Sequence, residues 1–235
     1  MKLKLKRTHK FSKSKEPKTT LVFLHGIGTD STYWDKAINF LENSKSLSED
    51  TRFLAFDWLG FGKSKKSRHF EYNYDEQLAA LENSLEKEVG NNQVILIAHS
   101  MGTLLAAKYA EKHKKQVKHL ILVSPAVFSP AEIKYLSNED NNIFLKKINQ
   151  KWLENRAFMN SMQNIVMNNS NQKTFEKLSV ETDLIRGEKD IFISHDNIKK
   201  LVKANKCLKC HTTIGHHSVT RDKYVKILEI LEKVK

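Results

Sequence analysis

Cysteine is almost absent from this chain of 235 residues, which contains only Cys207 and Cys210. Two cysteines are too few for a disulfide framework and are typical of a reducing compartment, so we expect two free thiols. No apolar run approaches the roughly 20 residues that a membrane-spanning helix needs, and the opening MKLKLKRTHKFSKSK lacks the apolar stretch of a secretory signal. These absences predict a cytoplasmic protein.

Acidic residues are outnumbered, and the excess of lysine and arginine gives a net charge of +13. Residues 1–18 carry eight basic residues and one acid, residues 199–235 carry ten and three, and each end therefore contributes +7. Charge without a recognition motif is a weak signal, so we expect solvated surfaces and no nucleic-acid partner. Weak peripheral contact of the N-terminal lysines with an anionic membrane stays open as an alternative.

Hydrophobic residues make up 40% of the chain and charged residues 29%, which predicts one folded domain; the sequence does not indicate an oligomeric state. The opening KLKLK, the polar turn SKSKEPK and the apolar residues 21–25 predict a hairpin. Strands and helices then alternate, which is typical of βαβ units and a mostly parallel sheet. Further strands are expected at 52–57, 93–98, 117–123, 182–186 and 210–214, and helices at 33–43, 74–89, 101–113, 195–203 and 222–234.

The alternation stops between residues 129 and 179, where a helical pattern rich in asparagine and lysine replaces it. We interpret this segment as a small helical cap inserted into a core that is made of residues 1–128 and 180–235. Its aromatic and methionine side chains could line a pocket, but apolar residues at helical spacing more often pack against one another. No cap residue is therefore assigned to a binding site.

The segment AHSMG has the context of a strand, a sharp turn and a helix. It follows the apolar run 94–97 and precedes the helical run 103–107, so Ser100 is expected at the top of the sheet, between the small residues Ala98 and Gly102. The helix that follows favours negative charge beside Ser100, which makes the Met101 amide a candidate oxyanion donor. The Ile27 amide in the glycine-containing HGIG turn is the second candidate.

Together the segments HGIG, DWLGFGKS, AHSMG, RGEKD and GHH resemble the α/β-hydrolase family in their order and approximate spacing. The resemblance spans nearly the whole chain apart from the cap. It implies an α/β-hydrolase fold with a catalytic triad of Ser100, Asp190 and His216. Glycine, with only eight residues, supports it, because all but Gly90 fall within these motifs. The seven are Gly26, Gly28, Gly60, Gly62, Gly102, Gly187 and Gly215.

Several neighbouring residues compete for the predicted roles. His217 stands beside His216 and is the alternative base, while Asp183 and Asp196 are alternative acids. His25 and His99 are expected to shape the site through structural hydrogen bonds, and Asp57 to organise a loop. The run Cys207-Leu208-Lys209-Cys210-His211 matches a haem-attachment pattern by chance, and no second pair of ligands accompanies it for zinc.

These residues predict a serine hydrolase that cleaves carboxylic esters of small or medium size, including lipid-derived ones, through an acyl-enzyme on Ser100. The chemistry needs no metal or organic cofactor. Thioesterases and C–C bond hydrolases share the same triad, and a non-catalytic ligand-binding protein on the same scaffold is a further alternative.

Overall fold

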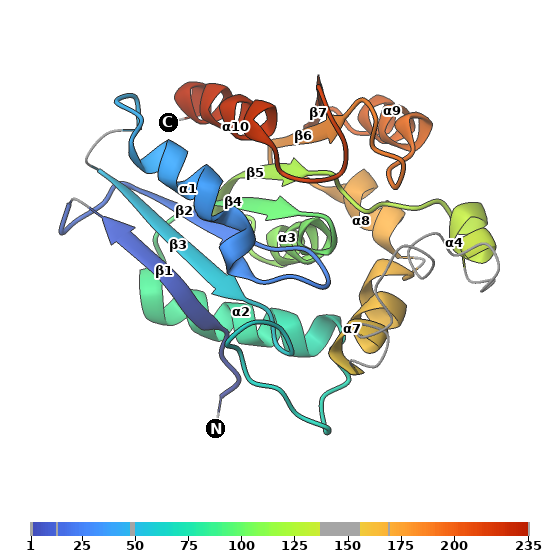
Figure 1. Ribbon diagram of the computed structural model, residues 1–235, viewed down its shortest axis with the longest axis horizontal. Coiled ribbons are helices and arrows are strands. Elements are labelled where there is room, and N and C mark those ends of the chain that lie inside the picture. The colour runs from blue at the N-terminus through green and yellow to red at the C-terminus, as the bar shows by residue number, and fades with distance from the viewer. Residues whose placement is uncertain (1, 13, 48–49, 137–155, 169, 235) are drawn as a thin grey trace.

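The computed structural model describes residues 2–12, 14–47, 50–136, 156–168 and 170–234, which form one seven-stranded sheet in the order β1-β3-β2-β4-β5-β6-β7. β1 is antiparallel to β3, and all other neighbours in the sheet are parallel (Figure 1). The predicted mostly parallel sheet is thus confirmed. The strands are β1 (Lys6–Ser12), β2 (Thr19–Leu24), β3 (Thr51–Asp57), β4 (Val94–His99), β5 (Val117–Val123), β6 (Thr182–Gly187) and β7 (Leu208–Thr213).

The predicted N-terminal hairpin is wrong. β1 and β2 follow one another in the chain, but β3 lies between them in the sheet, and Phe11 of β1 is paired with Phe53 of β3. Period-two alternation and a polar turn identify two strands, but they do not say whether a later strand inserts between the two. β1 and β7, which belong to the two basic ends of the chain, form opposite edges of the sheet.

Helices cover both faces of the sheet, as predicted. α1 (Asp35–Glu42) and α10 (Arg221–Val234) lie on one face, and the longer α2 and α3 lie on the other (Figure 1). The other helical elements among the described residues are η1 (Ser31–Trp34), α2 (Tyr74–Val89), α3 (Met101–Lys112), α4 (Pro130–Leu136), α7 (Arg156–Ser161), η3 (Met162–Val166), α8 (Asn171–Lys177) and α9 (His195–Ala204). None of the described helices is both long and apolar enough to cross a membrane.

The central strands read as continuous apolar runs because both of their faces are buried. In β4, Leu96 enters the core beneath α2 and α3, whereas Ile95 and Ile97 enter the core beneath α1 and α10. Each fully buried side chain of this kind contributes about 1.5–3 kcal/mol to folding. Packing in both cores therefore holds β4 in position. The last residue of β4, His99, directly precedes Ser100.

The described residues between β5 and β6 form short helices joined by irregular segments, and some of them pack directly on the core. Phe175 of α8 is fully buried in the core that contains α3, and the side-chain amide of Asn205 donates to the carbonyl groups of Phe175 and Leu178. Phe158 of α7 is buried against the same core. Residues 137–155 of the predicted cap lie outside the described residues, and the division into core and cap stays a prediction.

Candidate active site

Ser100 occupies a strained turn between β4 and α3. Its backbone has φ +50° and ψ −121°, a conformation that costs a residue with a side chain about 1–3 kcal/mol. The surroundings enforce it, because the Ser100 amide donates to the carbonyl of Val123 at 3.0 Å and its own carbonyl accepts from the amide of Thr103 at 2.9 Å. Ser100 therefore lies at a sharp bend, as predicted. The residue is only 6% exposed.

Two glycines let the neighbouring chain segments approach this turn. A Cβ atom at Gly102 would lie 2.5 Å from the carbonyl oxygen of His25, and one at Gly26 would lie 3.0 Å from the Cβ atom of Ser100. Cβ atoms do not approach backbone oxygens so closely, so Gly102 is required where α3 meets the end of β2. The HGIG turn and the AHSMG turn are thus in direct contact.

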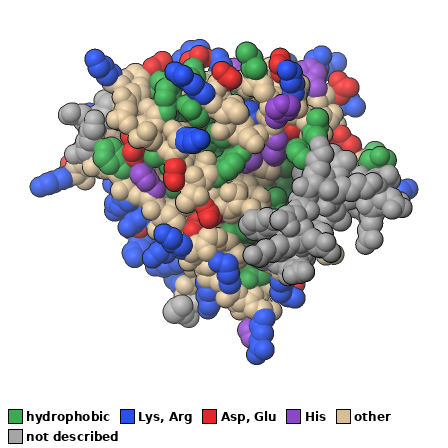
Figure 2. Space-filling view, in the orientation of Figure 1, with side chains coloured by type: hydrophobic (Ala, Val, Ile, Leu, Met, Phe, Trp, Pro, Cys, Tyr) green, Lys and Arg blue, Asp and Glu red, His purple; other side chains and the backbone are tan. Residues whose placement is uncertain are grey.

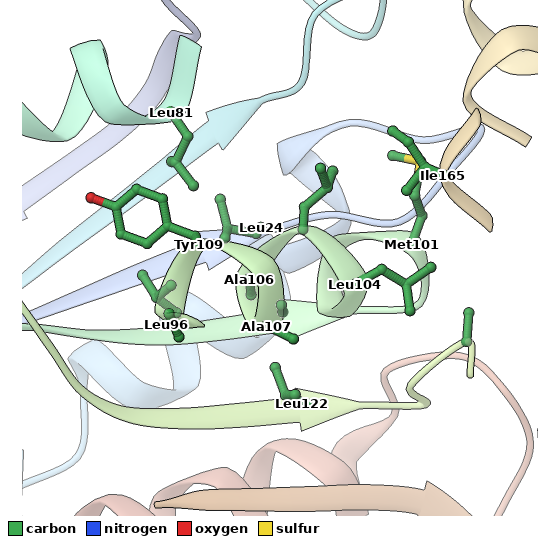
Figure 3. Close-up of a cluster of buried hydrophobic side chains, with 14 of the residues drawn as sticks. Leu24, Leu81, Leu96, Met101, Leu104, Ala106, Ala107, Tyr109, Leu122 and Ile165 are labelled. Carbon is green, nitrogen blue, oxygen red and sulfur yellow. The ribbon is translucent and has the colours of Figure 1, made fainter. Parts of the chain in front are cut away.

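α3 holds the turn in place through its packing on the sheet. Ala106 and Ala107 face the strands, where small side chains let the helix lie close to Leu96 and Leu122 (Figure 3). At its first turn the side chain of Met101 lies toward Ile165 of η3 (Figure 3). Ser100 therefore stands at the junction of the sheet, α3 and the segment that follows α7.

His217 and Asp190 form a pair at the same end of the sheet. The Nδ1 atom of His217 lies 3.1 and 3.0 Å from the two carboxylate oxygens of Asp190, and the Asp190 side chain is fully buried. Burial would raise the pKa of Asp190, but the hydrogen bond and the charge of His217 together lower it below its usual value. Asp190 is therefore ionised near neutral pH and accepts the Nδ1 proton, which leaves Nε2 of His217 with a free lone pair.

The predicted partnership of His216 with Asp190 is wrong. His216 is exposed, and its Nδ1 atom lies 3.1 Å from the carbonyl oxygen of Lys189. Its neighbour His217 is turned inward, where its ring lies 4.9 Å from the ring of His99, centre to centre. Adjacent residues in an irregular loop can point in different directions. His217, the alternative base, therefore binds Asp190 in the way that was expected of His216.

His99 links the serine turn to the histidine loop. Its Nε2 atom lies 3.0 Å from the carbonyl oxygen of His217, so Nε2 carries the proton and donates it. Burial, and then the charge of His217, lowers the pKa of His99 well below its usual value, which keeps the ring neutral. Because His99 directly precedes Ser100 in the chain, this bond ties the Ser100 turn to His217.

His25 joins the HGIG turn to the loop that follows β3. The amide of Trp58 donates to Nε2 of His25 at 2.9 Å, so the proton of the ring is on Nδ1, which donates to the carbonyl of Gly26 at 2.7 Å. Burial lowers the pKa of His25 to about 4. Asp57 also has the predicted organising role, because it accepts from the amides of Ser31 at 2.8 Å and Lys63 at 2.7 Å.

The two predicted oxyanion donors come from the segments that meet at Ser100. Met101 begins α3 and is fully buried, and Ile27 follows Gly26 in the HGIG turn and is partly buried against the core. Within the part of the chain that the structure describes, no acceptor binds either of these amide N–H groups. Both are available as donors, and their role in binding an oxyanion stays a prediction.

The other candidate groups lie elsewhere. Asp183 is the second residue of β6, as expected for a position away from the site, and Asp196 lies in the first turn of α9. Cys207 and Cys210 are free thiols, and His211 lies 2.5 Å from a carboxylate oxygen of Asp183. Among the described residues, no cluster of histidine, cysteine, aspartate and glutamate has the arrangement of a metal site.

Two residues at the site were missed by the sequence analysis. Ser124 directly follows β5, has φ +49°, and donates from its hydroxyl group to the carbonyl of His217 at 3.0 Å. Lys223 is fully buried in α10 and donates to the same carbonyl, also at 3.0 Å. Spacing offered one signal for Lys223, because it lies four and seven positions before Ile227 and Ile230, on the buried stripe of α10.

A comparison with protein families identifies a family profile that matches more than half of the chain. The family profile described as the alpha/beta hydrolase fold matches residues 19–161. This span begins with β2, includes the HGIG and AHSMG turns and ends at α7. It thus contains Ser100 and both predicted oxyanion donors.

Curated relatives match about half of the chain at 38–39% sequence identity. Over 111 residues the chain is 38% identical to the probable lysophospholipase BODYGUARD 1 of Arabidopsis thaliana, which covers 46% of this chain and 23% of that protein. Over 121 residues it is 39% identical to the 1-acylglycerol-3-phosphate O-acyltransferase ABHD5 of Homo sapiens, which covers 50% of this chain and 33% of that protein. The chain thus spans a third or less of the length of these relatives.

Solved structures match the whole fold at low identity. The monoacylglycerol lipase of Paleococcus ferrophilus superposes with a TM-score of 0.70 at 21% identity and covers 99% of this chain and 100% of that one. A carboxylesterase of Nitrososphaera gargenis superposes with a TM-score of 0.75 at 15% identity, over 98% and 94% of the two chains. At such identities the likeness establishes the fold and leaves the substrate undetermined.

Proposed function

The chain belongs to the α/β-hydrolase fold family, and from this premise we propose that it is a serine hydrolase that cleaves carboxylic esters through an acyl-enzyme on Ser100. In this proposal His217, in place of the predicted His216, is the general base, and Asp190 orients it. The observation that carries the proposal is the pairing of His217 with buried Asp190, which His99 ties to the strained turn at Ser100. Strain of this kind persists where the surrounding structure enforces it, and it is concentrated at functional sites.

The first half of the cycle forms the acyl-enzyme. The Oγ atom of Ser100 attacks the ester carbonyl carbon while Nε2 of His217 accepts the hydroxyl proton. The negative oxygen of the tetrahedral intermediate accepts hydrogen bonds from the amides of Met101 and Ile27. The C–O bond to the alcohol then breaks, and His217 returns the proton to the leaving oxygen.

Water completes the cycle along the same path. His217 removes a proton from the water as it attacks the acyl carbon, and the same amides hold the second tetrahedral intermediate. The bond to Ser100 then breaks, the acid departs, and the proton on His217 returns to Ser100. Throughout the cycle the ionised Asp190 holds the Nδ1 proton of His217 and stabilises the transient imidazolium.

Within the predicted class of carboxylic esters of small or medium size, the names of the relatives support a lipid-derived ester as the substrate. One relative is named a probable lysophospholipase and one structural neighbour a monoacylglycerol lipase, and both names describe the cleavage of an acyl ester. The relative named an acyltransferase points to a second candidate, in which an alcohol replaces water as the acceptor of the acyl group. Thioester and C–C bond hydrolysis would use the same three residues.

Basic residues at one edge of the sheet support weak peripheral contact with anionic membranes as an added proposal. Lys2, Lys4, Lys6 and Lys10 are exposed on or near β1, and Figure 2 shows lysine and arginine side chains gathered over this part of the surface. Sedimentation with anionic vesicles should detect binding at low salt that is lost at high salt. Absence of binding at low salt would contradict this contact.

A fluorophosphonate probe tests the proposed function. The wild type should be labelled on Ser100, and Ser100→Ala should lose both the label and the hydrolysis of p-nitrophenyl esters, by about 10⁴-fold or more. A panel of increasing acyl length, with thioester, amide and added-alcohol arms, then distinguishes the substrate classes and acyl transfer. An unlabelled wild type that is inactive on the whole panel would favour a ligand-binding protein instead.

A further inference from the structure

Lys223 is a lysine in a place where the fold favours an apolar residue. It lies in the first turn of α10, and its residue has no exposed surface. Ile227 and Ile230, which lie one and two turns later on the same stripe, are buried among apolar side chains. A buried ammonium group loses its hydration, so it persists only where the protein supplies strong acceptors.

Three acceptors surround the ammonium group of Lys223. Its Nζ atom donates to the carbonyl oxygen of His216 at 2.6 Å, to the carbonyl oxygen of His217 at 3.0 Å and to the hydroxyl oxygen of Ser124 at 3.0 Å. An ammonium group has three N–H bonds, and all three are thus used. Two of the three acceptors belong to the main chain of the histidine loop.

The carbonyl of His217 receives hydrogen bonds from three sides. Besides Lys223, the hydroxyl group of Ser124 and Nε2 of His99 donate to it, each at 3.0 Å. The loop between β7 and α10 contains no helix or strand, so regular backbone ladders do not fix its conformation. The orientation of the His217 ring therefore depends on these three donors, which come from α10, from the residue that follows β5 and from the last residue of β4.

We propose that Lys223 is a positioning residue that holds the main chain of His217, so that the imidazole stays between Asp190 and the hydroxyl group of Ser100. Lys223 acts through His217 and does not touch the reacting atoms. This inference rests on the proposed function for its effect on turnover. The contact between Lys223 and the histidine loop is independent of any substrate.

The charge of Lys223 adds a measurable signature. Burial lowers the pKa of Lys223 to about 8, and the negative charge of Asp190 only partly opposes this shift. The titratable groups that face Lys223 are Asp190 beyond β6, His216 and His217 beyond β7, and His99 at the end of β4. When the ammonium group loses a proton, two N–H bonds remain for three acceptors, so kcat should fall as the pH rises through about 8.

Lys223→Met tests the proposal, with Lys233→Met as the matched control on an exposed position of the same helix. On the best p-nitrophenyl ester, kcat of Lys223→Met should fall about 10- to 100-fold with little change in KM, because a displaced base slows proton transfer and leaves substrate binding intact. The alkaline fall in kcat should disappear in this variant. Lys233→Met should keep the wild-type kcat and pH profile.

Two further measurements keep the proposal falsifiable if Lys223→Met does not fold. The more conservative Lys223→Gln retains a donor and should recover part of kcat. In the wild type itself, a kcat that stays constant from about pH 7 to pH 10 would overturn the role of the ammonium group. Equal kcat values in folded Lys223→Met and in the control, or a loss confined to KM, would overturn the proposal as well.

Proton NMR separates this proposal from the proposed function. The downfield Nδ1 proton of His217, assigned by its absence in His217→Ala, should shift or broaden in Lys223→Met and stay unchanged in Lys233→Met. If the wild type hydrolyses no ester but this dependence is present, the positioning stands and the hydrolase proposal fails. If the wild type is active and both the resonance and kcat survive in Lys223→Met, the positioning alone fails.

Discussion

Among the residues that the structure describes, aspartate is paired with histidine in two buried places, and one of these two resembles a catalytic site. Asp190 binds Nδ1 of His217 and leaves Nε2 free, whereas Asp183 accepts from Nε2 of His119 at 2.7 Å and from Nε2 of His211 at 2.5 Å. The second cluster thus directs its Nε2 atoms at a carboxylate. A different ring nitrogen faces the acid in each cluster, and we infer from this difference that the two clusters have different roles.

The backbones beneath the two clusters differ as well. Asp183 and His119 lie within strands, but Ser100 and Ser124 beside the Asp190 cluster have φ of +50° and +49°. Backbone strain lowers stability, so the surrounding structure has to hold such residues in place. We infer that the Asp190 cluster is maintained for chemistry and the Asp183 cluster for the stability of the sheet.

The largest expected effect that separates the two clusters is on turnover. Asp190→Asn should lower kcat by about 10³- to 10⁴-fold, because an amide can present its N–H to His217 and stabilise the wrong tautomer. Asp183→Asn should leave kcat within about twofold of the wild type. Steady-state kinetics on one p-nitrophenyl ester measures both. A comparable loss of kcat in folded Asp183→Asn would remove the distinction.

The next effect is on the free energy of unfolding, where Asp183→Asn should lose more than Asp190→Asn. Asp183→Asn should reduce the free energy of unfolding by about 2–3 kcal/mol, because it leaves His119 and His211 without their carboxylate inside the sheet. Asp190→Asn, in the loop that follows β6, should cost less. Urea unfolding at neutral pH compares the two variants, and equal losses would argue against a structural role that is special to Asp183.

A third effect is the pH dependence of that stability. Burial raises the pKa of Asp183, but the hydrogen bonds and charges of His119 and His211 together outweigh this effect and lower the pKa below its usual value. A carboxyl group with a depressed pKa in the folded state stabilises the fold above its unfolded value, about pH 4, and this contribution is lost as the pH falls further. The stability gap between wild type and Asp183→Asn should therefore narrow below about pH 4. A constant gap down to pH 2 would contradict this.

The smallest effect concerns the strain at Ser100. Relative to Ser100→Ala, Ser100→Gly should be more stable by about 1 kcal/mol, because glycine adopts φ +50° freely and this gain exceeds the entropy that glycine adds to the unfolded chain. Thermal unfolding of the two inactive variants measures the difference. A glycine variant less stable than the alanine variant would show that the turn is not strained.

Much of the fold was predictable from residue patterns alone. The predicted helix 74–89 and strand 117–123 match α2 and β5 in both bounds, because an amphipathic helix with an Asn73 cap and a continuous apolar run are strong local signals. The order of the strands in the sheet was not predictable in this way. Insertion of β3 between β1 and β2 depends on contacts between distant segments, and alternation within each strand does not encode it.

The candidate site divides in the same way. The position of Ser100 was predictable from the strand before it, the turn and its small neighbours. The position of Asp190 was predictable because it comes soon after β6. His216 and His217 are adjacent in a loop without periodicity, so the sequence alone does not decide which ring turns inward. Lys223 was missed because a lysine in an amphipathic helix is ordinarily exposed, and its burial depends on acceptors from distant parts of the chain, namely two loop carbonyls and the Ser124 hydroxyl group.

The rate at which a fluorophosphonate labels Ser100 tests the central claim most directly, because it needs no knowledge of the natural ester. It should be measured by intact-protein mass spectrometry in the wild type, His217→Ala and His216→Ala. We predict that His217→Ala loses about 10³-fold or more of the labelling rate, while His216→Ala stays within a few-fold of the wild type. A large loss in His216→Ala with normal labelling of His217→Ala would contradict the account.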